Sequence, residues 1–327
     1  MKAFDLLQPE SLAEALEALS EAGARERAVA LAGGQDLLSE LQEHLLEPQM
    51  LVSLRGVGGL DEVGAEDGGL RVGAMATLAD LARDEVVLNS WTALAEAARS
   101  VGSPQIRTQA TVGGNLCQRP RCPYFRNEHA VCLKKGGQEC FAEGGLNRGN
   151  AILGGGPSFI VHPSDLAPAL VALDAGVRIA GSGGERDEVV EHLFTLPSEG
   201  DVTRETTLAA GELITSVKVP APVDGVRSTY LKFQERASFD FASASVALAL
   251  GVTGGRIHHA RICLGGVAPV PWRCERTERL LVGQVPGEAL FQRAALDALE
   301  EAEPLEHNAY KVPLAQGLLR KALRSLT

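Results

Sequence analysis

The chain has 327 residues, of which 45% are hydrophobic, and a formal net charge of −11 at pH 7. This length suffices for two or three ordinary globular domains with sizeable cores. The acidic balance argues against a nucleic-acid surface, which needs lysine and arginine to displace counterions from phosphates. Apolar runs such as 167–175 are much shorter than the ~20 residues of a membrane-spanning helix, so no membrane span is expected.

The N-terminal segment, residues 1–55, predicts a small α/β unit. Period-2 and helical patterns place strands at 3–7, 28–32 and 50–54, and helices at 11–22 and 37–45. The amphipathic start has acidic residues among its leucines and no small-residue cleavage site, so it does not read as a signal peptide. A cytoplasmic location is therefore expected.

Residues 56–220 predict a second unit and residues 221–327 a third. In the second we expect strands at 60–63, 70–74, 177–180 and 213–219, and helices at 78–82, 89–98 and 166–173. A stretch at about 117–157 lacks periodicity and looks like an inserted loop ordered for a function. In the third unit, strands at 228–233, 243–252 and 256–264 with helices at 287–300 and 310–325 predict an α+β domain with an antiparallel sheet.

Two glycine pairs stand where a phosphate could bind. Gly33-Gly34 follows a buried strand and precedes a helix, and Gly113-Gly114 forms a second turn. Glycine lets the backbone approach a bulky anion, and amides at a turn or helix start carry the partial positive charge that phosphate oxygens seek. A single pair is more often a tight turn, and neither pair matches the G-x-G-x-x-G pattern of a Rossmann fold.

Four cysteines fall within 24 residues: Cys117, Cys122, Cys132 and Cys140. Thiolates are soft ligands that suit zinc or iron-sulfur clusters, although this spacing fits neither a zinc ribbon nor the bacterial ferredoxin run. Disulfides are not expected in a reducing compartment. Cys263 and Cys274 lie in or near apolar strand sequence, so we expect them to be packed thiols.

The motifs in their order resemble the FAD-binding medium subunit of the xanthine dehydrogenase, or molybdenum hydroxylase, family over nearly the whole chain. The residues that carry this resemblance are AGGQDLL at 32–38, IRTQATVGGNL at 106–116, HPSD at 162–165, and YLK at 230–232 with Arg236 and Asp240. The resemblance implies an α+β protein. Its vanillyl-alcohol-oxidase-like (PCMH-type) FAD-binding fold would comprise two subdomains, 1–55 and 56–220, followed by the family's C-terminal α+β flavoprotein domain at 221–327.

The resemblance also implies the FAD-contacting residues. They are Ala32, Gly33, Gly34, Gln35, Asp36 and Leu37 at the first turn, Ile106, Thr111, Gly113, Gly114 and Asn115 at the second, and Ser164, Asp165 and Lys232. Both turns would cradle the pyrophosphate, and Asp165 would contact the flavin. Lys232 would lie near the isoalloxazine ring, where a cation stabilises the anionic reduced flavin.

The cysteine stretch resembles the insertion of 4-hydroxybenzoyl-CoA reductase and bacterial aldehyde oxidoreductases, which binds a [4Fe-4S] cluster through four cysteines. Cys122, Cys132 and Cys140 match that pattern, but Ser158 stands at the fourth position. Cys117 could replace the missing ligand, or Ser158 could coordinate through oxygen. A three-iron cluster, or loss of the cluster, stays open.

The implied function is that of an oxidoreductase flavoprotein subunit which transfers electrons within a complex. Its partners would be a molybdenum-cofactor large subunit and a [2Fe-2S] small subunit, in a dimer of three-subunit units, with NAD, ferredoxin or quinone as external carrier. A stand-alone flavin-dependent oxidoreductase is the alternative, but the seven histidines form no catalytic grouping by sequence. A zinc-binding structural protein would leave both glycine turns unexplained.

Overall fold

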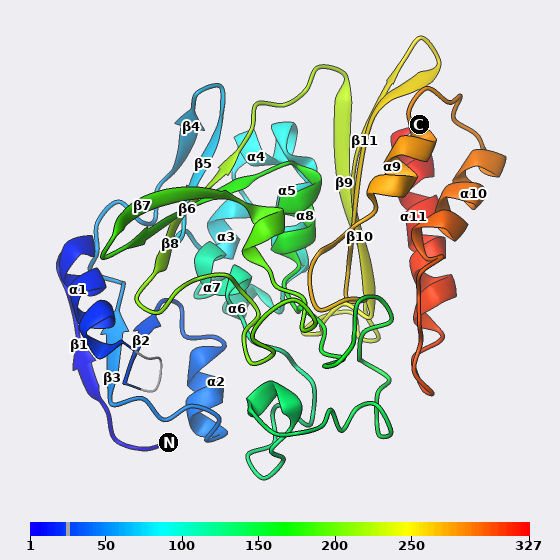
Figure 1. The fold of residues 1–327 in the computed structure, drawn as a ribbon. Coiled ribbons are helices and arrows are strands. Elements are labelled where there is room, and N and C mark those ends of the chain that lie inside the picture. Colours follow the sequence, from blue (N-terminus) through cyan, green and yellow to red (C-terminus); the bar gives the residue numbers. More distant parts are fainter. Residues whose placement is uncertain (24–26) are drawn as a thin grey trace.

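Three β-sheets organise the chain in this computed structural model, which describes residues 1–23 and 27–327 (Figure 1). The first sheet has the order β1-β3-β2 and is parallel throughout. Its elements are β1 (Asp5–Leu7), α1 (Leu12–Ala22), β2 (Ala28–Leu31), α2 (Leu37–Gln42) and β3 (Met50–Ser53). Parallel strands need crossover connections, and α1 and α2 provide them. The predicted N-terminal α/β unit is thus confirmed.

The second sheet has five antiparallel strands in the order β4-β5-β8-β6-β7. They are β4 (Val63–Glu66), β5 (Gly69–Gly73), β6 (Gly176–Gly181), β7 (Gly184–Val189) and β8 (Leu213–Val219). Helices and short turns connect them: α3 (Leu78–Leu81), α4 (Glu85–Ser90), α5 (Thr92–Ser100), α6 (Pro104–Arg107), α7 (Val112–Leu116), η1 (Leu133–Lys135), α8 (Leu166–Ala172) and η2 (Val190–Leu193). The cysteine-rich insertion therefore contains only one short 3-10 turn among the described elements.

The third sheet has the antiparallel order β12-β11-β10-β9, as the sequence predicts for the C-terminal unit. Its strands are β9 (Val226–Phe233), β10 (Ala244–Thr253), β11 (Arg256–Gly265) and β12 (Trp272–Arg273). Helices α9 (Glu275–Leu281), α10 (Glu288–Ala298) and α11 (Lys311–Leu326) pack beside it (Figure 1). The α+β class is confirmed, whereas the domain boundaries near residues 55 and 220 stay predictions.

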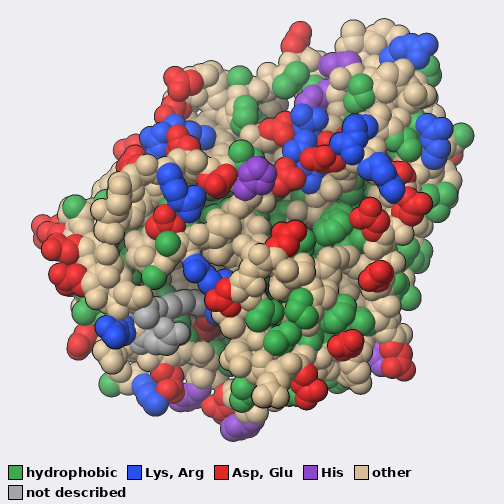
Figure 2. All heavy atoms as spheres, viewed as in Figure 1, with side chains coloured by type: hydrophobic (Ala, Val, Ile, Leu, Met, Phe, Trp, Pro, Cys, Tyr) green, Lys and Arg blue, Asp and Glu red, His purple; other side chains and the backbone are tan. Residues whose placement is uncertain are grey.

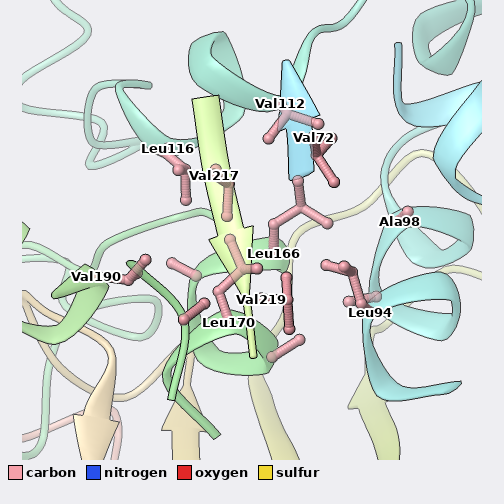
Figure 3. Packing of buried hydrophobic residues seen from close by; sticks show 14 of the residues in the cluster. Val72, Leu94, Ala98, Val112, Leu116, Leu166, Leu170, Val190, Val217 and Val219 are labelled. Atoms are coloured by element: carbon pink, nitrogen blue, oxygen red, sulfur yellow. The ribbon is translucent and has the colours of Figure 1, made fainter. Parts of the chain in front are cut away.

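Helix α8 lies at the centre of the main core. Leu166 and Leu170 are almost completely buried among Leu94, Val217 and Val219 (Figure 3). Because α8 also packs against β10 and β11, one apolar helix joins the second sheet to the third. Each such buried leucine stabilises the fold by about 1.5–3 kcal/mol relative to an exposed one. The HPSD segment directly before α8 is thereby held on a rigid base.

Several predicted elements were wrong. The strand predicted at 60–63 is a turn, because Leu60 is buried there as a loop residue and the strand β4 begins only at Val63. The single helix predicted at 89–98 is two helices, α4 and α5, which meet at Trp91. Strand β7 and helix α9 were not predicted, since their sequences are highly polar and show little apolar periodicity.

On the face shown in Figure 2, acidic and basic side chains are interspersed, without a continuous basic stripe. Within the described part of the chain, no helix combines the length and the apolar character needed to cross a membrane.

Candidate flavin site

The two glycine turns touch each other, although 80 residues separate them in the sequence. A Cβ atom on Gly33 would lie 1.9 Å from the carbonyl oxygen of Gln109, at the entry to the second turn. Only glycine permits this approach. At the second turn, Thr111 starts α7 by accepting a hydrogen bond of 3.2 Å from the amide of Gly114. Residues that follow strand β2 thus meet residues that follow helix α6 at one place.

A cavity of about 1370 Å³ opens between these turns. Of the residues predicted to contact FAD, it is lined by Ala32, Gly33, Gly34, Gln35, Asp36, Leu37, Ile106, Thr111, Gly114, Asn115 and Asp165. Three others are not among its lining residues. Gly113 packs instead on Ala74, with an added Cβ only 2.9 Å from the Ala74 Cβ. Ser164 is buried, and Lys232 lines a neighbouring pocket of about 400 Å³.

Three further segments line the cavity although they were not predicted to contact FAD. One is the segment 203–206 with 208–214, which leads into β8, and another is the start of the insertion, including Arg119 and Arg121. The loop between β9 and β10 adds Arg236, Phe239 and Phe241. The first stretch carries no motif that could have announced it, whereas the arginines beside Cys122 are visible in the sequence as groups that could bind an anion.

Asp165 belongs to a buried cluster with two residues of β9. The Lys232 Nζ lies 2.8 Å from Asp165 Oδ2, and the Tyr230 hydroxyl donates a 2.6 Å hydrogen bond to Asp165 Oδ1. Both charged side chains are only 4% exposed, and Lys232 also donates to the carbonyl of Ser100. Burial, followed by the neighbouring Asp165 carboxylate, raises the pKa of Tyr230, which stays a neutral donor. The predicted cation is therefore neutralised by Asp165 at the cavity wall.

The remaining HPSD residues brace the second glycine turn. The Ser164 hydroxyl donates a 2.6 Å hydrogen bond to Asn115 Oδ1 and accepts one from the amide of Ala167 in α8. His162 is buried, and its Nε2 lies 3.2 Å from the carbonyl oxygen of Leu116. Burial lowers the His162 pKa to about 4, so the ring is neutral near pH 7 and can donate to that carbonyl. The ring thus contacts the C-terminal end of α7.

The cysteines of the insertion are not gathered into a metal site in this structure. Cys117 is exposed and lines the cavity, Cys132 is buried, and Cys122 and Cys140 are half-buried. Across the described residues, no group of three or more His, Cys, Asp or Glu side chains is arranged to hold a metal ion. The prediction of a four-cysteine cluster is not confirmed, and the residues as placed do not fit one. Cys263 and Cys274 are buried thiols, as predicted.

The cavity, by contrast, fits a dinucleotide. Its volume exceeds the ~300–1,000 Å³ of common small-molecule pockets, and its walls combine apolar side chains with two glycine turns. The Nε of Arg121 is buried and has no hydrogen-bond acceptor among the residues described. A buried donor without an acceptor indicates that a bound ligand supplies one, such as a phosphate or carbonyl oxygen.

Comparison with known proteins agrees with this geometry. Residues 2–222 match the family described as the FAD binding domain in molybdopterin dehydrogenase, and residues 229–326 match the CO dehydrogenase flavoprotein C-terminal domain. The aldehyde oxidoreductase FAD-binding subunit PaoB of Escherichia coli (strain K12) is 36% identical over 328 residues, covering 99% of this chain and 98% of that protein. The carbon monoxide dehydrogenase medium chain of Hydrogenophaga pseudoflava is 27% identical, with 98% and 96% covered.

Solved structures give the same result. A chain of reconstituted CO dehydrogenase from Oligotropha carboxidovorans superposes with a TM-score of 0.79 at 25% identity, covering 99% of this chain and 97% of that one. Quinoline 2-oxidoreductase from Pseudomonas putida 86 gives 0.78 at 26% identity, covering 100% and 98%. Fold and cavity together define an FAD-binding oxidoreductase subunit. The chain belongs to the FAD-binding medium subunits of the molybdenum hydroxylase family, which includes the CO dehydrogenases and xanthine dehydrogenases.

Proposed function

We propose that the chain passes electrons between the [2Fe-2S] clusters of a small partner subunit and an external carrier such as NAD, ferredoxin or a quinone. A molybdenum-cofactor large subunit would convert the organic substrate. The observation that carries this proposal is the meeting of both glycine turns at one large cavity in a chain of this family. Bound FAD would supply the ability to exchange electrons singly or in pairs.

The residues of the cavity have separate parts in this proposal. Gly33, Gly34 and Gln35 at the first turn, with Gly114 and Asn115 at the second, would hold the pyrophosphate of FAD through backbone amides and the asparagine side chain. The Asp165–Lys232 pair lies at another part of the wall, where it would adjust the charge beside the isoalloxazine ring.

A stand-alone flavin oxidoreductase is disfavoured by the chemistry of the cavity. Such an enzyme needs an acid or base that faces its substrate. His162 is buried against the Leu116 carbonyl, and Asp165 is paired with Lys232, so neither is available for this task. The organic substrate would then bind in the large partner subunit. The name of the 36% identical relative makes an aldehyde the first substrate to try.

The test is rapid-mixing spectroscopy on the chain alone and on the chain co-expressed with the proposed large and small partner subunits. We expect roughly one FAD per chain, and flavin reduction by an aldehyde or another substrate only in the complex. Reduction in the chain alone would favour the stand-alone enzyme. A purified chain that neither contains nor takes up FAD would refute the assignment of this cavity.

We propose, as a finer point, that the insertion is of the 4-hydroxybenzoyl-CoA reductase type and binds a [4Fe-4S] cluster. Cys122, Cys132 and Cys140 would be ligands, with Cys117 or Ser158 as the fourth. Support comes from Asn150, whose Nδ2 lies 3.6 Å from the Cys122 Sγ and donates a 2.9 Å hydrogen bond to the carbonyl of Phe159, the neighbour of Ser158. Ser158 is buried in the same part of the chain. The insertion would have to rearrange to gather the ligands.

Iron and acid-labile sulfide, measured on anaerobically purified protein, test this point independently of FAD. About four irons per chain would support the cluster. FAD without iron would reject the cluster and leave the flavin assignment intact, while zinc without FAD would reject both.

A further inference from the structure

Asp36 does not cap the helix that it precedes. It stands at the N-cap position of α2, where an aspartate usually accepts hydrogen bonds from the first helical amides, but its side chain makes no such bond. Its carboxylate points instead to the cysteine insertion. Asp36 Oδ2 accepts a 2.6 Å hydrogen bond from the backbone amide of Arg119, and Oδ1 lies 2.7 Å from Arg126 and 2.8 Å from Arg121.

This contact is buried and organises the start of the insertion. The Asp36 side chain is 14% exposed and that of Arg126 is 11% exposed, so solvent screens the pair little. Arg126 also donates to the carbonyls of Pro120 and Arg119, which closes the loop that contains Cys122 around the carboxylate. One side chain thus fixes the conformation of residues 119–126.

A second buried carboxylate extends the connection to the next part of the insertion. Arg119 Nε lies 2.8 Å from Glu205 Oε2, and Lys134 Nζ lies 3.1 Å from Glu205 Oε1. Lys134, which follows Cys132 by two residues, is 2% exposed and also donates to the carbonyl of Arg204. The backbone amide of Arg119 contacts Asp36 and its side chain contacts Glu205, so polar contacts run without a break from the first glycine turn to Lys134, beside Cys132.

The same residues form one wall of the flavin cavity. Asp36, Arg119, Glu205 and Lys134 all line it, next to the glycine turn, and so does Arg121 with its unpaired Nε. The Asp36 carboxylate is bound to residues of the insertion. The first turn can therefore bind an anionic ligand through its backbone amides. The position of the insertion and the shape of the turn are consequently fixed by the same contacts.

From these contacts we propose that Asp36 is a positioning residue that couples the cysteine insertion to FAD binding. The proposal rests on the assignment of FAD to this cavity. FAD bound at the turn orders residues 119–135, and an ordered insertion in turn raises the affinity for FAD, since coupling between two sites acts equally in both directions. A change that displaces the insertion therefore weakens FAD retention.

The test measures FAD affinity and amide hydrogen exchange on the full chain, with and without FAD. In the wild type, FAD should slow exchange at residues 126–127, 129–130 and 132–133 of the insertion, which do not line the cavity and so are not shielded by FAD directly. Asp36→Asn keeps the side-chain volume but removes the charge. It should weaken FAD binding on the order of tenfold, within the usual range of coupling between sites, and abolish the slowing of exchange in the insertion.

Two more variants separate coupling from damage to the turn. Arg126→Gln removes a partner of Asp36 that does not line the cavity, so it should weaken FAD in the same direction, and the double variant should be clearly less than additive. Glu43→Gln is the matched control, because Glu43 reaches Arg126 only at 3.6 Å and is 42% exposed. It should behave as the wild type.

Each outcome is decisive. FAD that binds the wild type without changing exchange at 126–127, 129–130 and 132–133 overturns the coupling and leaves the flavin site standing. Unchanged FAD affinity in both Asp36→Asn and Arg126→Gln overturns the role of Asp36. A wild-type chain that binds no FAD under any condition refutes the proposed function itself. Should Asp36→Asn fail to fold, Arg126→Gln alone still decides.

Discussion

Substitution of Gly33 by alanine tests whether the contact between the two turns builds the flavin site. The new Cβ would lie 1.9 Å from the Gln109 carbonyl oxygen and 2.8 Å from its carbonyl carbon. The first distance is about 1.5 Å short of an ordinary van der Waals contact, and the opposing atoms are backbone, which cannot rotate away. The two turns must therefore separate.

The cost follows from this geometry. Overpacking of a well-ordered contact usually destabilises a protein by about 1–3 kcal/mol. For a chain of this size we expect a fall in Tm on the order of 5 °C. The variant should also bind FAD more weakly, because a pyrophosphate that both turns hold loses its contacts with one of them when the turns separate. Loss of about 1.4 kcal/mol would already weaken binding tenfold.

The assay is FAD titration of the apoprotein, followed by quenching of flavin fluorescence, together with thermal unfolding of the same samples. Gly58→Ala is the matched control, since an added Cβ there meets nothing within 4 Å. Gly33→Ala should bind FAD at least tenfold more weakly than Gly58→Ala. Equal FAD affinity of the two variants would refute the argument that the approach of the turns forms the site.

Further expectations concern stability. The pKa of His162 is about 4 in the folded chain and 6.5 in the unfolded chain, so the unfolded state binds a proton first as the pH falls. The free energy of unfolding, measured by denaturant titration, should therefore fall by about 3 kcal/mol between pH 6.5 and pH 4. In His162→Leu the fall over the same pH range should be smaller. Lys232→Met leaves the buried Asp165 carboxylate without its cation and should lower the free energy of unfolding in urea by about 3–5 kcal/mol. Arg236→Met, whose ion pair is exposed, should lower it by less than ~1 kcal/mol. Equal losses in the two variants would contradict this reasoning. By the same measurement, Leu166→Ala should lower the free energy of unfolding by about 2–5 kcal/mol. Leu296→Ala, at an exposed site, should lower it by about 0.5 kcal/mol or less. The reverse order would disprove the central place of α8 in the core.

Most elements with a strong local pattern could be predicted from the sequence. The strand β8 was predicted with the bounds that the structure has, and Ser11 caps α1 by accepting from the amide of Glu14. Elements without such a pattern were missed. Strand β7 is an edge strand that exposes most of its polar side chains, so no alternation marks it. The strand predicted at 60–63 failed because a buried leucine is equally common in a loop that packs on a core.

The sequence by itself determined the family motifs, the two glycine turns and the apolar helix that follows the HPSD segment, since turn chemistry and periodicity are local properties. Only the tertiary structure decided which charges meet. Asp36, which is predicted to contact FAD and lines the cavity, is bound to arginines more than 80 residues away, while Lys232 is paired with Asp165. Neither pairing follows from spacing, because partners in a folded chain are chosen by the packing of separate elements. The cavity wall at 203–214 and the separation of the cysteines have the same origin.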